Sequence, residues 1–262
     1  MNMNRKFSLI TVVLLGIFLV GCDQPAETAK KNKGLEVKRS LPQVEPGIFD
    51  KSVVSSTGEI VRYTVAIPKT YDPEKPTPLI VALHFGGRVT PHYARGIVQL
   101  LVLPGLAELN AIVIAPDSIA GGWNNDKNEA MVLELMDYAA TLYNVDKEKT
   151  LLTGFSMGGH GTWYVGSRNQ DRFSAMIPIA GSPRIDPDLK WSTPIYVIHS
   201  KADEVVPIGP TEDYVAAQKA IGNEDVEFVV VDDLPHFETA RFAEPLKQAV
   251  PWVQKIWGTV DQ

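Results

Sequence analysis

Cysteine is almost absent from this chain of 262 residues, in which Cys22 is the only one. A single thiol has no partner in the chain for a disulfide and no second cysteine with which to hold a metal ion. The chain also lacks a basic excess, since 25 lysines and arginines stand against 31 aspartates and glutamates. Outside residues 30–39 the sequence contains no basic stripe, which argues against nucleic acid as a partner.

An apolar run near the start extends from Leu9 to Val20 and follows the basic residues Arg5 and Lys6. A charged start and a short apolar core are typical of a secretory signal peptide, and the run is too short to span a membrane comfortably. We therefore expect residues 1–21 to be removed and to take no part in the fold.

The apolar run ends in Leu-Val-Gly-Cys22, which resembles the lipobox of bacterial lipoproteins. This resemblance implies that Cys22 becomes the lipidated first residue and anchors the protein in the bacterial cell envelope, facing the periplasm or the exterior. Asp23 resembles the signal that retains lipoproteins of enteric bacteria in the inner membrane. Residues 22–46 are rich in charge and proline and poor in large apolar side chains, which predicts a disordered tether.

The rest of the chain, residues 47–262, has the composition and length of one α/β domain. Apolar runs without polar alternation, typical of strands covered on both faces, occur at residues 60–67, 79–83, 111–115, 150–153, 175–179, 195–198 and 226–231. Helical patterns occur at residues 97–109, 128–143, 159–167, 211–221 and 240–257. Their alternation predicts a mostly parallel sheet with helices on both faces and ligands at the carboxyl ends of the strands.

Ser156 lies inside a G-x-S-x-G sequence, directly after a predicted strand and before a predicted helix. A strand that turns into a helix within a few residues strains the central residue, and Gly154 and Gly158 avoid the collisions that a Cβ would make there. The pattern predicts a nucleophile elbow with an accessible Ser156 Oγ. The N–H of Met157 would then face an anion that forms beside this oxygen.

A serine hydroxyl needs a base and an orienting acid to act as a nucleophile. Asp203 lies in the loop after the predicted strand at residues 195–198 and is the candidate acid. His236 lies in the loop after the predicted strand at residues 226–231 and is the candidate base.

Other residues compete for both roles. Glu204, Asp232 and Asp233 are alternative acids, because the first adjoins Asp203 and the other two shortly precede His236 in the chain. His199 is the alternative base, but its place at a strand end ahead of the acid favours a structural hydrogen-bonding role.

A loop rich in small residues follows the predicted strand at residues 79–83. A backbone N–H of Phe85 or Gly86 in this loop would face the developing oxyanion together with that of Met157. The alternative reading of the loop is an ordinary Gly-Gly turn.

Three further ring side chains are candidates near the site. Trp123 follows the predicted strand at residues 111–115 and is expected either to stack on an aromatic or sugar-like substrate or to pack in the core. His160, on the first turn after the elbow, is expected to line the pocket or to pack. His92 has no supporting context and is expected at the surface.

Taken together, these motifs resemble the α/β-hydrolase superfamily, and within it the secreted esterase and predicted-peptidase group related to feruloyl esterases and polyhydroxybutyrate depolymerases. The matching segments are residues 153–163, 172–181, 194–203 and 205–207, and His236. Ser156, Asp203 and His236 follow the superfamily's order of nucleophile, acid and base. Relatives usually have glycine at the positions of Phe85 and Ser200, and neither departure removes a reacting group.

The resemblance implies an α/β-hydrolase fold and a serine carboxylic-ester hydrolase that acts through an acyl-enzyme on a small-molecule or polymer ester, without a metal or organic cofactor. The short segment between residues 179 and 195 leaves no room for a large helical lid, so we expect an open site. A serine peptidase of the same fold is the nearest alternative. The other is a membrane-tethered binding protein without activity, against which the intact Ser156, Asp203 and His236 argue.

Overall fold

The computed structural model describes residues 41–259. The expectations for the signal peptide, for Cys22 and for residues 22–40 of the tether lie outside this range. Within it, the helices are too short or too polar for any of them to cross a membrane.

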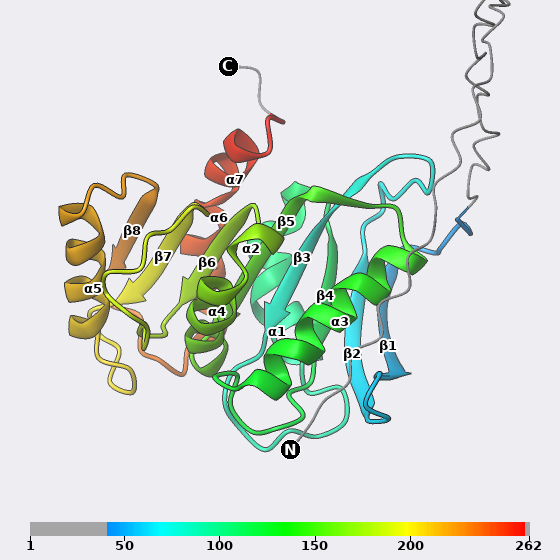
Figure 1. The fold of residues 1–262 in the computed structure, drawn as a ribbon, viewed down its shortest axis with the longest axis horizontal. Coiled ribbons are helices and arrows are strands. Elements are labelled where there is room, and N and C mark those ends of the chain that lie inside the picture. The colour runs from blue at the N-terminus through cyan, green and yellow to red at the C-terminus, as the bar shows by residue number, and fades with distance from the viewer. Residues whose placement is uncertain (1–40, 260–262) are drawn as a thin grey trace, which may run out of the picture. The chain divides into compact units, whose positions relative to one another are not determined.

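The centre of the domain is an eight-stranded sheet with the strand order β1-β2-β4-β3-β5-β6-β7-β8 (Figure 1). Its strands are β1 (Gly47–Val54), β2 (Ile60–Ile67), β3 (Thr77–Leu83), β4 (Ile112–Pro116), β5 (Val145–Phe155), β6 (Ala175–Ile179), β7 (Ile195–Ser200) and β8 (Val226–Val231). From β4 to β8 all neighbours are parallel, whereas β1 and β2 add an antiparallel edge. The predicted mostly parallel sheet is therefore confirmed.

The edge strand β1 was not predicted. Its inner residues include Asp50 and Lys51, and its side chains are half-buried or exposed. An edge strand with one solvated face lacks the continuous apolar run that identified the buried strands.

Helices cover both faces of the sheet. The helical elements are α1 (Arg95–Ile97), η1 (Val98–Val102), α2 (Leu103–Leu106), η2 (Ala107–Leu109), α3 (Asp126–Leu142), α4 (Met157–Arg168), η3 (Gln170–Arg172), α5 (Gly209–Ala220), η4 (Thr239–Phe242), α6 (Ala243–Lys247) and α7 (Val250–Ile256). Buried residues of α3, α4 and α5 share one hydrophobic cluster, and those of α1, η1, α2, α6 and α7 share the other. Figure 1 shows α3 and α4 in front of the sheet.

Two predicted long helices are divided into shorter pieces. The segment predicted as one helix over residues 97–109 contains the π-helical turn η1, which ends just before Pro104. The segment predicted over residues 240–257 is divided into η4, α6 and α7, and Pro251 lies in the first turn of α7. Proline lacks the N–H that would continue the hydrogen-bond ladder, so each helix changes its pitch or ends near such a residue.

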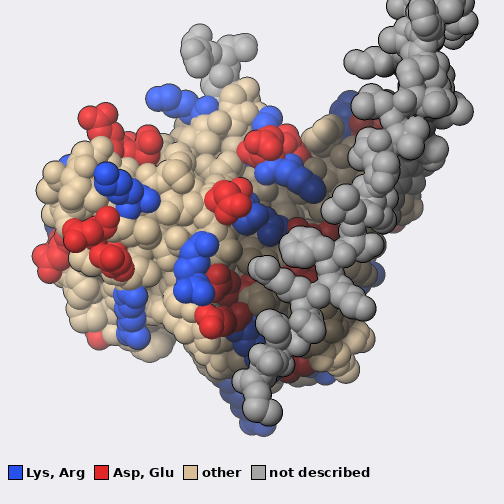
Figure 2. All heavy atoms as spheres, viewed as in Figure 1, with Lys and Arg blue, Asp and Glu red and all other residues tan. Residues whose placement is uncertain are grey.

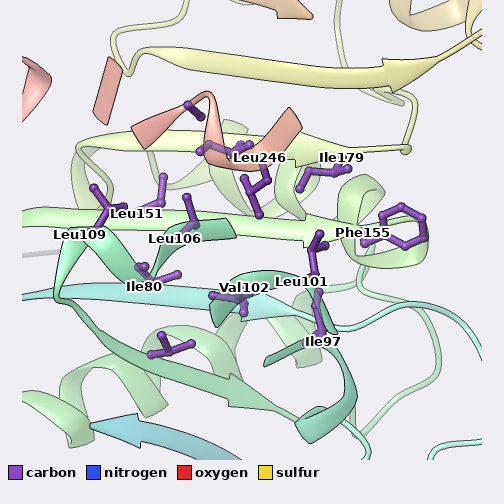
Figure 3. Packing of buried hydrophobic residues seen from close by; sticks show 14 of the residues in the cluster. Ile80, Ile97, Leu101, Val102, Leu106, Leu109, Leu151, Phe155, Ile179 and Leu246 are labelled. Carbon is purple, nitrogen blue, oxygen red and sulfur yellow. The ribbon is translucent and has the colours of Figure 1, made fainter. Parts of the chain in front are cut away.

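The cluster behind the sheet is built from aliphatic side chains of several elements (Figure 3). Leu101 and Leu106 of η1 and α2 and Leu246 of α6 pack over strand residues such as Ile80 and Leu151. Burial of each such side chain contributes on the order of 2 kcal/mol relative to its exposure to water. The central strands are thereby fixed from both sides, and their carboxyl ends form a rigid edge.

The strand order brings distant loops together at this edge. From β3 the chain continues to β4, which pairs with β3 on one side. The next strand, β5, pairs with β3 on its other side, so the order in which strands are added to the sheet changes direction between β3 and β5. Such a switch point is where open α/β sheets bind ligands. The loops after β7 and β8 also adjoin, because those two strands pair in parallel.

Residues 180–194, between β6 and β7, contain no helix. The expectation of a fold without a large lid is confirmed for the described part of the chain. On the face seen in Figure 2, acidic and basic side chains are interspersed and no basic stripe is visible.

Candidate active site

Ser156 occupies a strained turn between β5 and α4. Its backbone angles are φ 56° and ψ −114°, an unusual region for a residue with a side chain. A Cβ on Gly158 would lie 1.9 Å from the carbonyl oxygen of Leu83, and one on Gly154 would lie 2.3 Å from that of Gly158. The Ser156 N–H donates to the Ile179 carbonyl of β6 at 2.9 Å. The predicted nucleophile elbow is therefore present.

The structure brings together the three side chains that the sequence singled out. The Oγ of Ser156 lies 2.7 Å from Nε2 of His236, and Nδ1 of His236 lies 2.7 Å from Oδ2 of Asp203. Both His236 and Asp203 are buried. A carboxylate only accepts hydrogen bonds, so Nδ1 carries the proton and Nε2 is free to accept the Ser156 hydroxyl.

Asp203, rather than one of the rival acids, is the carboxylate that contacts the His236 ring. Its second oxygen, Oδ1, accepts the N–H groups of Val205 and Val206 at 3.0 and 2.7 Å, which fixes the carboxylate in a tight turn. Glu204 accepts only the backbone N–H of His236, at 3.2 Å.

The other two rival acids lie at the surface, away from the imidazole. Asp232 is exposed and pairs with Lys201 at 2.8 Å. Asp233 is exposed as well.

His199 has the structural role that its position indicated. Its Nδ1 lies 3.0 Å from the Thr211 hydroxyl of α5, and its Nε2 lies 2.9 Å from the carbonyl oxygen of Val206. The ring is fully buried, and this burial lowers the pKa of His199. His199 thus connects β7, α5 and the turn that contains Asp203. Its Nε2 lies 3.6 Å from Oδ2 of Asp203.

The loop after β3 lies beside the elbow. A Cβ on Gly86 would lie 3.9 Å from the Cβ of Met157, so the two predicted oxyanion segments adjoin. Met157 is the first residue of α4, where a backbone N–H has no partner within the helix. The Phe85 ring packs on the cluster behind the sheet and edge-on against Tyr93, 5.6 Å between centroids. The departure from glycine at Phe85 is therefore accommodated by apolar contacts.

Trp123 does not face a substrate, so that alternative is wrong and core packing is correct. The side chain is fully buried, and its Nε1–H donates to the carbonyl oxygen of His84 at 2.9 Å. Gly161 of α4 leaves room for it, because a Cβ there would lie 2.3 Å from the Trp123 Cβ. The Trp123 bond to the His84 carbonyl joins the loop after β4 to the loop after β3, and the buried indole is not accessible at the open edge.

The remaining two histidines differ in their surroundings. His160 is half-buried, with Nδ1 2.7 Å from the carbonyl oxygen of Ser182, and burial lowers its pKa. His92, expected at the surface, is instead partly buried in a left-handed conformation with φ 60°. The backbone N–H of His92 donates to Oδ2 of Asp117 at 2.7 Å. A local pattern gives no sign of this contact, because Asp117 lies after a different strand.

Two exposed apolar residues beside the candidate triad were missed. Phe237 is 79% exposed, and its ring stands edge-on to the ring of His236 at 5.5 Å. Val205 is 46% exposed and follows Asp203 by two positions. Both loops contain other apolar residues, such as Val206 and Leu234, so the sequence alone does not show which of them are exposed.

No group of three or more His, Cys, Asp or Glu side chains in residues 41–259 is arranged to hold a metal ion.

A strained serine at the end of a central parallel strand, with an acid after β7 and a histidine after β8, defines an α/β-hydrolase. The chain belongs to the dienelactone hydrolase family, whose model matches residues 106–236. This range extends from α2 to His236 and includes the elbow and Asp203.

A curated relative is the probable feruloyl esterase C of Aspergillus niger, 30% identical over 62% of this chain and 61% of its own length. The chain thus spans about three fifths of that relative. A thermostable esterase has the same fold, with a TM-score of 0.67 and 24% identity over 79% of this chain and 62% of its own. A ferulic acid esterase aligns with a TM-score of 0.65 and 21% identity over 81% of this chain and 100% of its own. The resemblance to esterases of the α/β-hydrolase superfamily is confirmed.

We expect the stability of the domain to decrease as the pH falls below about 6.5, the usual pKa of histidine. Burial lowers the pKa of His199, and His236 adds to this effect, whereas the bond to the Val206 carbonyl and the charges of Asp203 and Glu212 oppose it. The unfolded chain therefore takes up this proton first, and stability that is present above this pH is lost as the pH falls towards the folded-state pKa.

In a His199→Gln variant, the decrease in the free energy of unfolding between about pH 8 and about pH 5.5 should be smaller than in the unsubstituted protein. Urea unfolding of both full-length proteins at the two pH values measures this decrease in the free energy of unfolding. Equal decreases would show that His199 is not one of the groups responsible.

Proposed function

We propose that this protein is a serine carboxylic-ester hydrolase that acts through an acyl-enzyme formed on Ser156. The observation that carries the proposal is the continuous chain of two 2.7 Å contacts from the strained Ser156 through His236 to the buried Asp203. This is the arrangement by which a weak hydroxyl nucleophile is activated at neutral pH. The esterase names of its relatives agree with this chemistry.

In the first half of the reaction, the Oγ of Ser156 attacks the ester carbonyl carbon while Nε2 of His236 takes its proton. The tetrahedral intermediate collapses, the bond to the alcohol oxygen breaks, and His236 returns the proton to that oxygen. In the second half, His236 removes a proton from water as the water oxygen attacks the acyl carbon. Ser156 leaves as the protonated hydroxyl, and the acid is released.

The negative charge on the carbonyl oxygen is stabilised by backbone N–H groups. One is that of Met157 at the start of α4, where the helix end also favours an anion. The second comes from Phe85 or Gly86 in the loop after β3. Such donors act on charge that develops only in the transition state, so they raise kcat rather than substrate affinity.

The substrate class that we propose is supported by the names of the relatives and by two exposed apolar residues near the site. One curated relative is named a probable feruloyl esterase, so a feruloyl ester is the first candidate substrate. Phe237 and Val205 would offer apolar contacts to such an acyl group or to the chain of a polymer ester. His160 is proposed to line the same site.

Replacing Ser156 with alanine should abolish ester hydrolysis, with kcat reduced by about 10⁶-fold because the nucleophile is lost. The measurement is turnover of a panel of p-nitrophenyl esters from acetate to long acyl chains, a feruloyl ester and a p-nitroanilide. The full-length protein and its Ser156→Ala variant are compared, and both must show the same thermal unfolding.

The alternatives give different results in that assay. Ser156-dependent cleavage of the anilide without ester turnover would identify a peptidase. No turnover of any substrate, together with no labelling of Ser156 by a fluorophosphonate, would identify a binding protein without activity and refute the proposal.

Asp203→Asn should reduce kcat by about 10⁴-fold, because an amide stabilises the wrong imidazole tautomer while it preserves the shape of the side chain. Glu204→Gln is the matched control, since its amide oxygen can still accept the His236 N–H, and its kcat should stay within about threefold of the unsubstituted protein. Comparable losses in the two variants would mean that Asp203 is not the orienting acid.

We also propose that residues 1–21 are a signal peptide, that Cys22 is lipidated and that residues 22–46 tether the domain, residues 47–262, to a membrane of the bacterial envelope. In a bacterial host the unsubstituted protein should then fractionate with membranes, and its N-terminal peptide should carry a diacylglycerol on Cys22 by mass spectrometry. Cys22→Ser should release the protein from the membrane fraction. Membrane association that survives this substitution would refute lipid anchoring.

A further inference from the structure

Three successive backbone carbonyl groups in the loop after β3 each lie within hydrogen-bonding distance of a donor on a tryptophan, histidine or tyrosine side chain. The His84 carbonyl accepts the Trp123 Nε1–H at 2.9 Å. The Phe85 carbonyl oxygen lies 2.8 Å from Nδ1 of His84, and the Gly86 carbonyl accepts the Tyr93 hydroxyl at 3.1 Å. These contacts hold the candidate oxyanion loop from one peptide group to the next.

A trans peptide group is planar, and its N–H points away from its C=O. The Trp123 bond to the His84 carbonyl therefore also sets the direction of the Phe85 N–H. In the same way, the contact between Nδ1 of His84 and the Phe85 carbonyl sets the direction of the Gly86 N–H. Both candidate oxyanion donors are oriented through the carbonyl oxygen of their own peptide group.

The protonation of His84 follows from its second nitrogen. Nε2 accepts the Ser118 N–H at 3.0 Å, so the proton of the neutral ring is on Nδ1 and is donated to the Phe85 carbonyl. The ring is fully buried between Trp123 and Tyr93, each edge-on with a centroid distance of 5.0 Å. This burial lowers the pKa of His84, which favours the neutral ring, although the bond to the Phe85 carbonyl and the charge of Asp117 oppose the shift.

The far end of the same loop is fixed as well. Both oxygens of Asp117, in the segment directly after β4, accept backbone N–H groups, from His92 at 2.7 Å and from Ala94 at 2.9 Å. Residues 117–118 thus hold the loop after β3 at two places, through Asp117 and through the Ser118 bond to His84.

Gly86 adjoins Met157, the other expected donor, since a Cβ on Gly86 would lie 3.9 Å from the Met157 Cβ. We propose that His84, clamped by Ser118 and Trp123, is a positioning residue that directs the Gly86 N–H towards the oxyanion. This inference rests on the proposed function, since it concerns the same site. It gives His84 and Trp123 a role in transition-state stabilisation without contact with the substrate.

Two substitutions of His84 separate its two contacts. In His84→Asn, the amide nitrogen can take the place of Nδ1 and donate to the Phe85 carbonyl, while the Ser118 contact is lost. In His84→Gln, the amide oxygen can take the place of Nε2 and accept the Ser118 N–H, while the Phe85 contact is lost. A purely structural role of His84 would not favour one variant over the other at equal stability.

Loss of one oxyanion donor typically reduces kcat by about 10² to 10³-fold. We expect His84→Gln to reduce kcat at least about tenfold with KM unchanged, and His84→Asn to stay within about threefold of the unsubstituted full-length protein. The rate of Ser156 labelling by a fluorophosphonate should fall in parallel with kcat, because its phosphoryl oxygen occupies the same place. Equal losses in the two variants, or a loss confined to KM, would overturn the proposal.

The labelling rate also separates this inference from the ester proposal. If the unsubstituted protein reacts with the fluorophosphonate but turns over no ester, only the ester activity is refuted and the labelling rates of the two variants still decide the role of His84. If esters are hydrolysed but both variants match the unsubstituted protein, only the role of His84 is refuted.

A second pair of variants applies if His84→Gln does not fold. Trp123→Phe removes the N–H bond to the His84 carbonyl and should reduce kcat at least about threefold at constant KM. The matched control is Trp163→Phe, which also removes a buried indole N–H bond, to the Gly181 carbonyl at 2.8 Å, but does not bind the loop after β3. Equal effects of the two tryptophan variants on kcat would refute the proposed positioning.

Discussion

The feature on which the whole site depends is the close approach of α4 to the end of β3 at the elbow. A hydrogen atom is all that fits at Gly158, since a Cβ there would lie 1.9 Å from the Leu83 carbonyl oxygen. This contact lets the chain reverse within two residues and leaves Ser156 in a left-handed conformation with its Oγ outside the sheet. The strain is sustained because β5 is buried on both sides between paired strands.

Strand order then determines which side chains can meet Ser156. Because β3 adjoins β5, the loop that holds Phe85 and Gly86 lies beside the first turn of α4. Because β7 and β8 pair in parallel, the loops with Asp203 and His236 adjoin, and both rest on the rigid carboxyl edge of the sheet. Precise placement at such an edge matters, since a displacement of about 1 Å can reduce the rate of a reaction between positioned groups by about 10²-fold.

Much of this arrangement could be predicted from local patterns. Continuous apolar runs identified seven strands, of which the five from β4 to β7 in the sheet order are almost fully buried along these runs, and G-x-S-x-G identified the elbow because the motif describes the turn itself. Local patterns failed for the strand β1, which lies at the edge of the sheet and is partly exposed to solvent. They also failed near Pro104 and Pro251, where the repeat of apolar residues predicted one long helix but the structure contains several shorter ones. Phe85 departs from the pattern of relatives, yet its ring simply packs behind the sheet.

The sequence by itself determined the class of fold and the candidate nucleophile, because the apolar runs and the G-x-S-x-G motif around Ser156 are each local patterns in the chain. Only the tertiary structure placed Asp203 rather than Glu204 against the His236 ring, buried Trp123 beside the His84 carbonyl, and gave His84 its two partners. Those outcomes depend on which groups from separate strand ends come within hydrogen-bonding distance. Such distances follow from the packing of the whole sheet, and no segment of the chain contains them.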